Sequence, residues 1–155
     1  MPTDPAATLY FAYGSNLDET QMRRRCASAR RVGVATLPDY ALSFDGHSRV
    51  WCGPVASLLP LPGSLVHGLV YDLQACDLAA LDRFEGYPSS YTRIEVSLSD
   101  ASGAGLRALT YVRPSGDPRF TRGAPPVAYL TLLEQAYQRH GFDLGLLSAA
   151  ARWPR

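Results

Sequence analysis

The chain alternates between stretches with strand-like and helix-like spacing of apolar side chains. Every second residue of Ile94–Leu98 is apolar, which predicts a half-buried strand. Within Asp77–Phe84 apolar residues recur at helical spacing, which predicts a helix that Gly86 ends. A similar pattern predicts a longer helix at about Pro126–His140, with Gly141 as its stop.

The rest of the chain predicts further strands joined by turns. Leu9–Tyr13 is an aromatic run that ends in a glycine turn, and Asp18–Arg25 follows as a short helix with Asn16 or Asp18 available as its cap. Further strands are predicted at Arg31–Thr36, Tyr40–Phe44, Val55–Leu59, Leu65–Tyr71 and Leu106–Val112. A turn at Pro62-Gly63 would join Val55–Leu59 to Leu65–Tyr71 as a hairpin. In the second of these strands, Gly68 would mark a bulge or a close approach.

This order of elements, mostly strands with helices between strand groups, is typical of an α+β fold around a mixed sheet or small barrel. The 155 residues fit a single domain that spans residues 1–155. Hydrophobic residues make up 46% and charged residues 19%, a balance that supports a buried core and argues against disorder.

The net charge and the types of basic residue exclude several classes of function. The formal net charge is +1, so no overall field attracts nucleic acid or anionic lipid. All 15 basic residues are arginines. The absence of lysine from the sequence excludes Schiff-base chemistry, a lysine general base and a phosphate-loop lysine.

Cysteine and histidine positions predict neither a metal site nor a disulfide framework. Cys26, Cys52 and Cys76 do not form a C-x-x-C motif, and the three histidines are not spaced from them as zinc ligands usually are. The first residues lack the charged and apolar regions of a signal peptide, and no apolar stretch approaches the ~20 residues of a membrane span. We therefore expect a cytoplasmic protein without a bound metal.

Three motifs then appear in a fixed order. Tyr10–Leu17 reads YFAYGSNL, Leu81–Gly86 reads LDRFEG, and Tyr91–Val96 reads YTRIEV. Weaker matches lie at Trp51–Ala56 and Pro126–Leu130. Together these segments resemble the γ-glutamyl cyclotransferase family, which includes γ-glutamylamine cyclotransferases and AIG2-like proteins, over almost the whole chain.

The resemblance implies a small mixed β-barrel with flanking helices, no cofactor, and release of 5-oxoproline from a small γ-glutamyl substrate. By position, Glu85 matches the catalytic acid and base, and Tyr129 matches a tyrosine near the site. The substrate-binding loop corresponds to Tyr13, Gly14, Ser15, Asn16 and Leu17. The segment around Trp51 departs most from the family pattern, with Pro54 where a second glycine is often found. The leaving group therefore stays open between an amino acid, an amine and a biosynthetic intermediate.

Glu85 also suits proton transfer on physical grounds. It sits at the predicted C-terminal end of a helix, where the dipole disfavours a carboxylate and should raise its pKa. The alternative interpretation is an exposed residue at a helix end. Asp82, one turn earlier, is the rival carboxylate.

The glycine loop and the strand after Glu85 each allow two interpretations. Backbone N–H groups at the Gly14 turn could receive a carboxylate, or the turn could simply lead into a helix capped by Asn16. Tyr91 and Arg93 share one side of a strand, and both are substrate-binding candidates. Arg93 could instead pair with Glu95 or Asp82. Tyr129 could bond to Glu85 or substrate, or belong to the core.

Three other functions compete. The arginines at Arg23–Arg25 suggest nucleic-acid binding, but no aromatic residues interleave with them, so we expect no nucleic-acid partner. A non-catalytic relative could bind a γ-glutamyl ligand or a partner protein, although such a protein would be free to lose Glu85. Cys52 with His47 or His67 could form a hydrolytic pair, but no flanking motif supports one. The oligomeric state is not encoded in any of these patterns.

Overall fold

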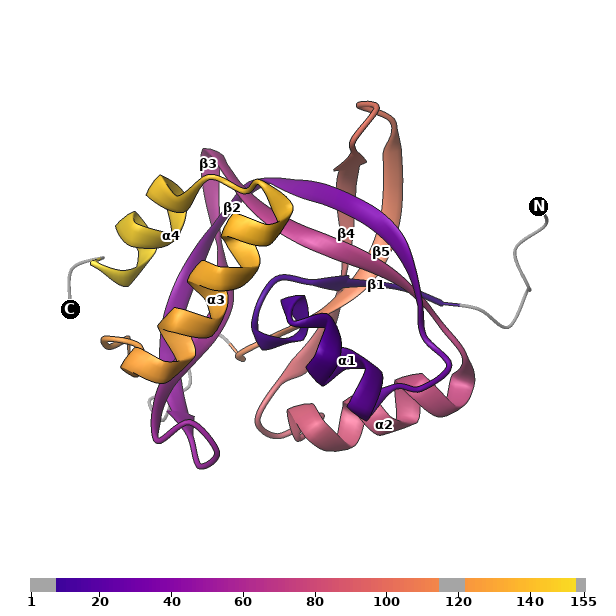
Figure 1. Cartoon of the computed structure of the whole chain (residues 1–155), viewed down its shortest axis with the longest axis horizontal. Helices are drawn as coiled ribbons and strands as arrows, with labels where there is room; N and C mark the ends of the chain where they lie inside the picture. Colours follow the sequence, from indigo (N-terminus) through magenta and orange to yellow (C-terminus); the bar gives the residue numbers. More distant parts are fainter. Residues whose placement is uncertain (1–7, 115–121, 153–155) are drawn as a thin grey trace.

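The computed structural model describes residues 8–114 and 122–152. The elements in chain order are β1 (Thr8–Ala12), the short 3-10 helix η1 (Ser15–Leu17), α1 (Glu19–Arg25), β2 (Arg30–Ser48), β3 (Gly53–Leu73), α2 (Ala75–Glu85), β4 (Thr92–Asp100), β5 (Gly105–Val112), α3 (Val127–His140) and α4 (Leu144–Ala151). Figure 1 shows α1 beside α2 on one flank of the strands, and α3 beside α4 on another.

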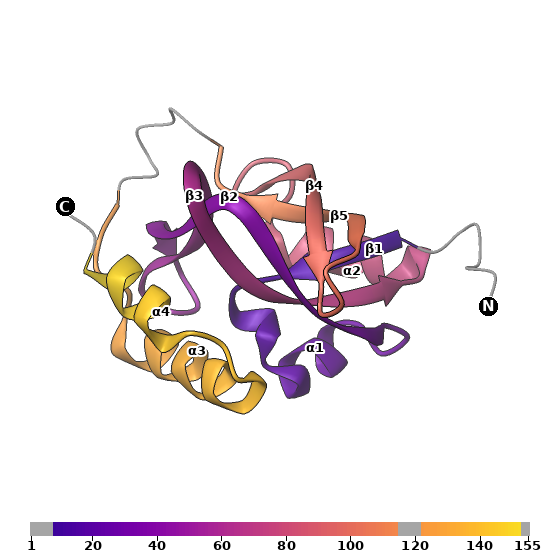
Figure 2. The same cartoon turned by 90° about the horizontal axis from the view of Figure 1, so that it is seen from above.

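The strands close into a barrel in the order β1-β3-β2-β4-β5. β5 lies parallel to β1, with Tyr10 opposite Leu109, and the other neighbouring strands are antiparallel. Figure 2 shows the long β2 and β3 curving together round one side of the barrel. The predicted α+β class, with a small mixed barrel and flanking helices, is therefore confirmed.

The predicted hairpin at Pro62-Gly63 is wrong. Val55–Leu59 and Leu65–Tyr71 do not pair with each other, because both belong to β3 and both pair antiparallel with β2. The two strands predicted at Arg31–Thr36 and Tyr40–Phe44 are likewise parts of the single strand β2. The result is a long two-stranded ribbon that bends to form much of the barrel wall.

A bulge explains why this ribbon looks like separate strands in the sequence. The pairing of β2 with β3 shifts between Pro38 and Tyr40, where the partner register skips residues 61–64. Asp39 has a φ of 63° at the bend, and its carboxylate accepts a hydrogen bond of 3.0 Å from the Gly63 N–H. The turn-forming residues therefore bend two paired strands rather than reverse the chain.

Gly68 marks a close approach of strands. A Cβ atom there would lie 2.4 Å from a ring carbon of Phe11 and 2.5 Å from the carbonyl oxygen of Ala12. Pairing with β2 runs through Gly68 without a register shift, so the alternative interpretation as a bulge is wrong. The missing side chain leaves room for the Phe11 ring and the Ala12 carbonyl where β3 pairs with β1.

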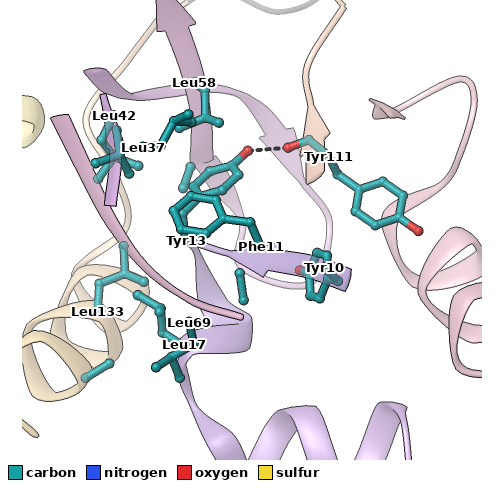
Figure 3. Packing of buried hydrophobic residues seen from close by; sticks show 14 of the residues in the cluster. Tyr10, Phe11, Tyr13, Leu17, Leu37, Leu42, Leu58, Leu69, Tyr111 and Leu133 are labelled. Carbon is teal, nitrogen blue, oxygen red and sulfur yellow. Dashed lines mark hydrogen bonds between the residues drawn. The ribbon is translucent and has the colours of Figure 1, made fainter. Parts of the chain in front are cut away.

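The core fills the barrel and continues beneath α3. Phe11, Leu69 and Leu133 are fully buried, and they connect β1, β3 and α3 in one cluster (Figure 3). Tyr13 extends this cluster, and its hydroxyl donates a hydrogen bond to the backbone carbonyl of Tyr111 (Figure 3). The segment after β1 is thereby fixed to the end of β5, next to the functional site.

The predicted helix ends are largely correct, and one helix was missed. Gly86 and Gly141 end α2 and α3 in the left-handed conformation, as predicted. Asp18 caps α1 by accepting a hydrogen bond of 3.1 Å from the Thr20 N–H. α4 was not predicted because its sequence, LGLLSAAA, is apolar on most faces and lacks a helical period. It packs against β2.

Candidate active site

A cavity of about 630 Å³ opens between the end of β1, the β2–β3 turn, the end of α2 and the start of α3. Its buried side, here called the floor, is formed by polar and aromatic side chains: Tyr10, Tyr13, Asn16, Tyr91, Tyr111 and Tyr129. Its exposed edge, here called the rim, comes from the end of β2, the β2–β3 turn and α2: His47, Arg49, Val50, Arg83 and Phe84. A volume of this size suits a small-molecule ligand.

Glu85 lies in the wall of this cavity as the last residue of α2. Its side chain is half-buried, and burial raises its pKa to about 7, against the opposing influence of Arg25 and Arg113. The upward direction matches the sequence-based expectation, and burial is its largest cause. At neutral pH the carboxyl group is therefore present in both protonation states.

The glycine loop forms one end of the floor. Leu17 and Asp18 donate their backbone N–H groups to the carbonyls of Gly14 and Ser15. Among the described residues, this leaves the N–H groups of Ser15 and Asn16, the first two of η1, available for a ligand. The interpretation of Asn16 as a helix cap is wrong, because Asp18 caps α1.

Side-chain contacts hold Asn16 in one orientation. Its amide nitrogen donates to the Tyr10 hydroxyl at 3.0 Å, and its oxygen accepts from Gln21 at 3.0 Å and from Arg25 at 3.3 Å. Gln21 also donates to the Ser15 hydroxyl at 2.7 Å. The loop is therefore rigidly supported by α1 before any ligand binds.

Two tyrosines form hydrogen bonds to the backbone of one β3 residue. Tyr91 donates its hydroxyl hydrogen to the carbonyl of Ala56 at 2.8 Å, and the Tyr129 hydroxyl oxygen accepts from the Ala56 N–H at 3.0 Å. A Cβ atom on Gly14 would lie 3.2 Å from that Tyr129 hydroxyl. Burial raises the pKa of both tyrosines, so both stay neutral.

Two candidate residues lie outside the cavity lining. Leu17 is fully buried in the core beneath the loop. Arg93 pairs with Asp82 at 3.8 Å and stacks over the ring of Tyr87 at 4.2 Å. The Asp82 carboxylate also accepts a hydrogen bond of 2.6 Å from Tyr111, so the rival carboxylate is held by two partners away from the cavity.

Arg113 is a cavity residue that the sequence interpretation missed. Its side chain is 7% exposed, lies 4.3 Å over the ring of Tyr91 and donates to the Ser90 carbonyl at 3.2 Å. Its guanidinium also lies 3.8 Å from Asp45. A usable signal was its position directly after a predicted strand, because the loops that connect such elements often carry binding residues.

The described residues offer no sign of the alternative chemistries. Within residues 8–114 and 122–152, no three His, Cys, Asp or Glu side chains are grouped to hold a metal ion. The same ranges contain no helix long and apolar enough to cross a membrane. His67 stacks on Phe142 at 4.9 Å, and His47 lines the cavity whereas Cys52 does not, so the alternative pair of Cys52 with either histidine is not assembled in the lining.

Most of the chain matches the sequences of known proteins. The family model described as Gamma-glutamyl cyclotransferase, AIG2-like matches residues 10–130. The protein named Gamma-glutamylcyclotransferase from Homo sapiens is 35% identical over 146 residues, covering 91% of this chain and 76% of that protein. The Bos taurus protein of the same name is 36% identical over 113 residues, covering 70% of this chain. The match spans only 60% of the bovine protein's length.

Solved structures agree with the sequence relatives. A structure named Gamma-glutamyl cyclotransferase has a TM-score of 0.83 at 28% identity, covering 94% of this chain and 87% of that chain. A human protein described as uncharacterized has a TM-score of 0.84 at 28% identity, covering 95% and 88%. The barrel fold is therefore shared, and the chain belongs to the gamma-glutamyl cyclotransferase, AIG2-like family.

Proposed function

We propose that this protein is a γ-glutamyl cyclotransferase that converts a γ-glutamyl substrate into 5-oxoproline and a free amine, with Glu85 as general acid and base. The observation that carries the proposal is a half-buried carboxyl group with a pKa of about 7 in the wall of a small-molecule cavity. The names of the human and bovine relatives support the same activity.

The reaction needs no nucleophile from the protein. The substrate's own α-amine can close a five-membered ring on the γ-carbonyl carbon, provided that the glutamyl chain is folded back on itself. Holding such a geometry contributes up to roughly 7–11 kcal/mol in well-aligned reactions. The Ser15 and Asn16 N–H groups and the Arg25 guanidinium, close together at one end of the floor, would fix the α-carboxylate.

Glu85 would move one proton in each of two steps. Its carboxylate takes a proton from the α-ammonium, and the freed amine attacks the γ-carbonyl carbon. As the tetrahedral intermediate collapses, the bond from this carbon to the leaving nitrogen breaks, and Glu85 returns the proton to that nitrogen. The ring nitrogen loses its second proton to solvent, which leaves the lactam N–H of 5-oxoproline. Positioned proton transfer of this kind contributes about 10²–10⁴-fold, most effectively near neutral pKa.

The experiment measures 5-oxoproline release from γ-glutamyl-alanine and γ-glutamyl-glutamine by the parent protein and by Glu85→Gln. The amide keeps the size of the side chain but cannot exchange the proton. We expect release by the parent and a fall of at least about 10²-fold in the variant. Circular dichroism of both proteins checks that the fold is retained.

Two results would contradict this assignment. Equal activity of parent and variant would remove Glu85 from the chemistry. No release by either protein, together with binding of the γ-glutamyl compound measured by calorimetry, would favour the non-catalytic ligand-binding function instead.

A further inference from the structure

The cavity lining has a strong excess of positive charge. Its charged side chains are four arginines, Arg25, Arg49, Arg83 and Arg113, and a single carboxylate, Glu85. A γ-glutamyl group brings one ammonium and one carboxylate, so by itself it does not balance this excess. The charge of the leaving group is therefore the variable that the cavity can select.

Two of the four arginines already have partners among the residues around the cavity. Arg113 lies 3.8 Å from Asp45 and is stacked on Tyr91. Arg25 donates to the Asn16 oxygen in the glycine loop and lies 4.7 Å over the ring of Phe84. Both guanidinium groups therefore belong to the part of the cavity in which the glutamyl portion of the substrate, with its α-carboxylate, would lie beside Glu85.

The other two arginines belong to the rim. Arg49 comes from the β2–β3 turn and Arg83 from the last turn of α2, and both are exposed. Neither makes an ion pair with any carboxylate in residues 8–114 and 122–152. They face the same cavity from two elements that are distant in the sequence, and they lie on its open side.

The floor and the rim differ in a way that orients the substrate. The floor is enclosed and consists of tyrosine and asparagine side chains, several of which already bond to one another or to backbone. A compact group of constant structure, the glutamyl portion, fits there. The leaving group, attached at the γ-carbonyl beside Glu85, must then extend towards the rim.

We infer that the leaving group is an acidic amino acid, whose two carboxylates are bound by Arg49 and Arg83. This inference rests on the proposed function. Two guanidinium groups that have no ion pair within the described part of the chain match two carboxylates, each of which can accept paired N–H donors. An alkylamine would leave both arginines without a partner, and the ammonium of a lysine leaving group would be repelled by them.

The test compares kcat/KM for γ-glutamyl-glutamate and γ-glutamyl-glutamine, which have the same shape and differ by one charge. At low ionic strength we expect the glutamate compound to be favoured about tenfold, because the rim is open to water and its charges are partly screened. Raising the salt concentration to about 0.5 M should reduce this ratio, because surface charges are then screened within a few ångström.

Substitutions locate the effect. Arg49→Gln and Arg83→Gln should each lower the glutamate-to-glutamine ratio to about threefold, and Arg83→Glu should bring it below one. Arg152→Gln is the matched control, because it removes one exposed arginine from the end of α4, across the molecule from α2 (Figure 1). Its ratio should equal that of the parent.

The outcomes separate this inference from the proposed function. Turnover of both dipeptides at equal kcat/KM, or a ratio that the rim substitutions leave unchanged, would overturn the acidic leaving group while the cyclotransferase activity stands. Turnover of neither dipeptide, nor of γ-glutamyl-alanine, would overturn the proposed function itself. A ratio that falls with Arg49→Gln and Arg83→Gln but not with Arg152→Gln would support both.

Discussion

Helices α2 and α3 end with the same backbone geometry but with an acidic and a basic last residue, respectively. Each is followed by a left-handed glycine, Gly86 with φ 65° and Gly141 with φ 71°, whose N–H bonds back into the last turn. The last residue of α3 is His140, preceded by an arginine, which agrees with the negative helix terminus. The last residue of α2 is Glu85, which opposes it.

This contrast separates a structural helix end from a functional one. The end of α3 is a self-consistent stop, with its basic residues near the last carbonyls. At the end of α2 a carboxylate lies where both the dipole and burial disfavour its charge, and it faces a cavity. Local rules are expected to be broken where a site requires it.

The largest expected effect comes from moving the carboxylate without removing it. Glu85→Asp keeps the charge but withdraws the carboxyl group by one methylene, so we expect kcat/KM to fall about 10²-fold. His140→Gln, the matching change at the end of α3, should stay within about twofold in specific activity. A fall of similar size in both proteins would mean that the two helix ends do not differ in function.

The two helix ends should also respond to pH in opposite directions. Burial raises the pKa of Glu85 from 4.5 to about 7, so between these values the folded protein holds a proton that the unfolded chain releases. Stability therefore falls as pH rises through this window, by about 3 kcal/mol in total. Glu85→Gln removes this loss, so urea unfolding should show a smaller drop from pH 5 to pH 8 than in the parent.

For His140 the sign is reversed. Burial, with a contribution from Arg31, lowers its pKa below 6.5, so the unfolded chain takes up a proton first as pH falls. Its contribution to stability is lost on the acidic side rather than the basic side.

If Glu85→Gln and the parent lost stability equally between pH 5 and pH 8, the raised pKa of Glu85 would be contradicted.

Alanine at the two glycines should separate their roles at a smaller scale. Gly141→Ala meets no atom within 4 Å and should cost about 1 kcal/mol, the penalty of the left-handed conformation. Gly86→Ala has the same penalty, and its Cβ would also lie 2.9 Å from the Ser90 side chain. We expect a cost of about 2 kcal/mol and reduced activity, measured by thermal unfolding and 5-oxoproline release. Equal losses would show that Ser90 adapts.

The smallest effect concerns a single neighbouring charge. Arg25 lowers the pKa of Glu85, so Arg25→Gln should move the acidic limb of the kcat/KM profile to higher pH. Arg24→Gln removes an exposed arginine from the same helix outside the cavity and should leave the limb in place. A shift in both variants would point to net charge rather than to the position of Arg25.

Local patterns in the sequence predicted most elements but not the pairing of the strands. Ile94–Leu98 alternates because one face of β4 is buried, and the glycine stops of α2 and α3 need only nearby residues. The ribbon of β2 and β3 was missed because Asp39 and Gly63 resemble turn residues, whereas their hydrogen bond joins residues 24 positions apart. Helix α4 carries no periodic signal.

The residues of the candidate site were likewise predicted where they form local motifs and missed where they depend on contacts between distant parts of the chain. Glu85 and the loop at Gly14 are local motifs, so the sequence predicted them as candidates, and the structure brings both to the cavity. The contacts of Arg113 with Tyr91 and Ser90 depend on the path of the chain, and no local pattern encodes them. Arg93 has the strand position of a binding residue, yet its partner is Asp82.

The contact between Tyr129 and the Ala56 N–H has a consequence for how the protein is made. Gly14 belongs to the beginning of the chain, Ala56 to its middle and Tyr129 to its last third, and all three meet at the cavity. A ribosome must therefore release α3 before the floor can close. A chain truncated before Tyr129 would still carry Glu85 and the glycine loop, but we expect it to have no enclosed place in which to turn over a γ-glutamyl compound during synthesis.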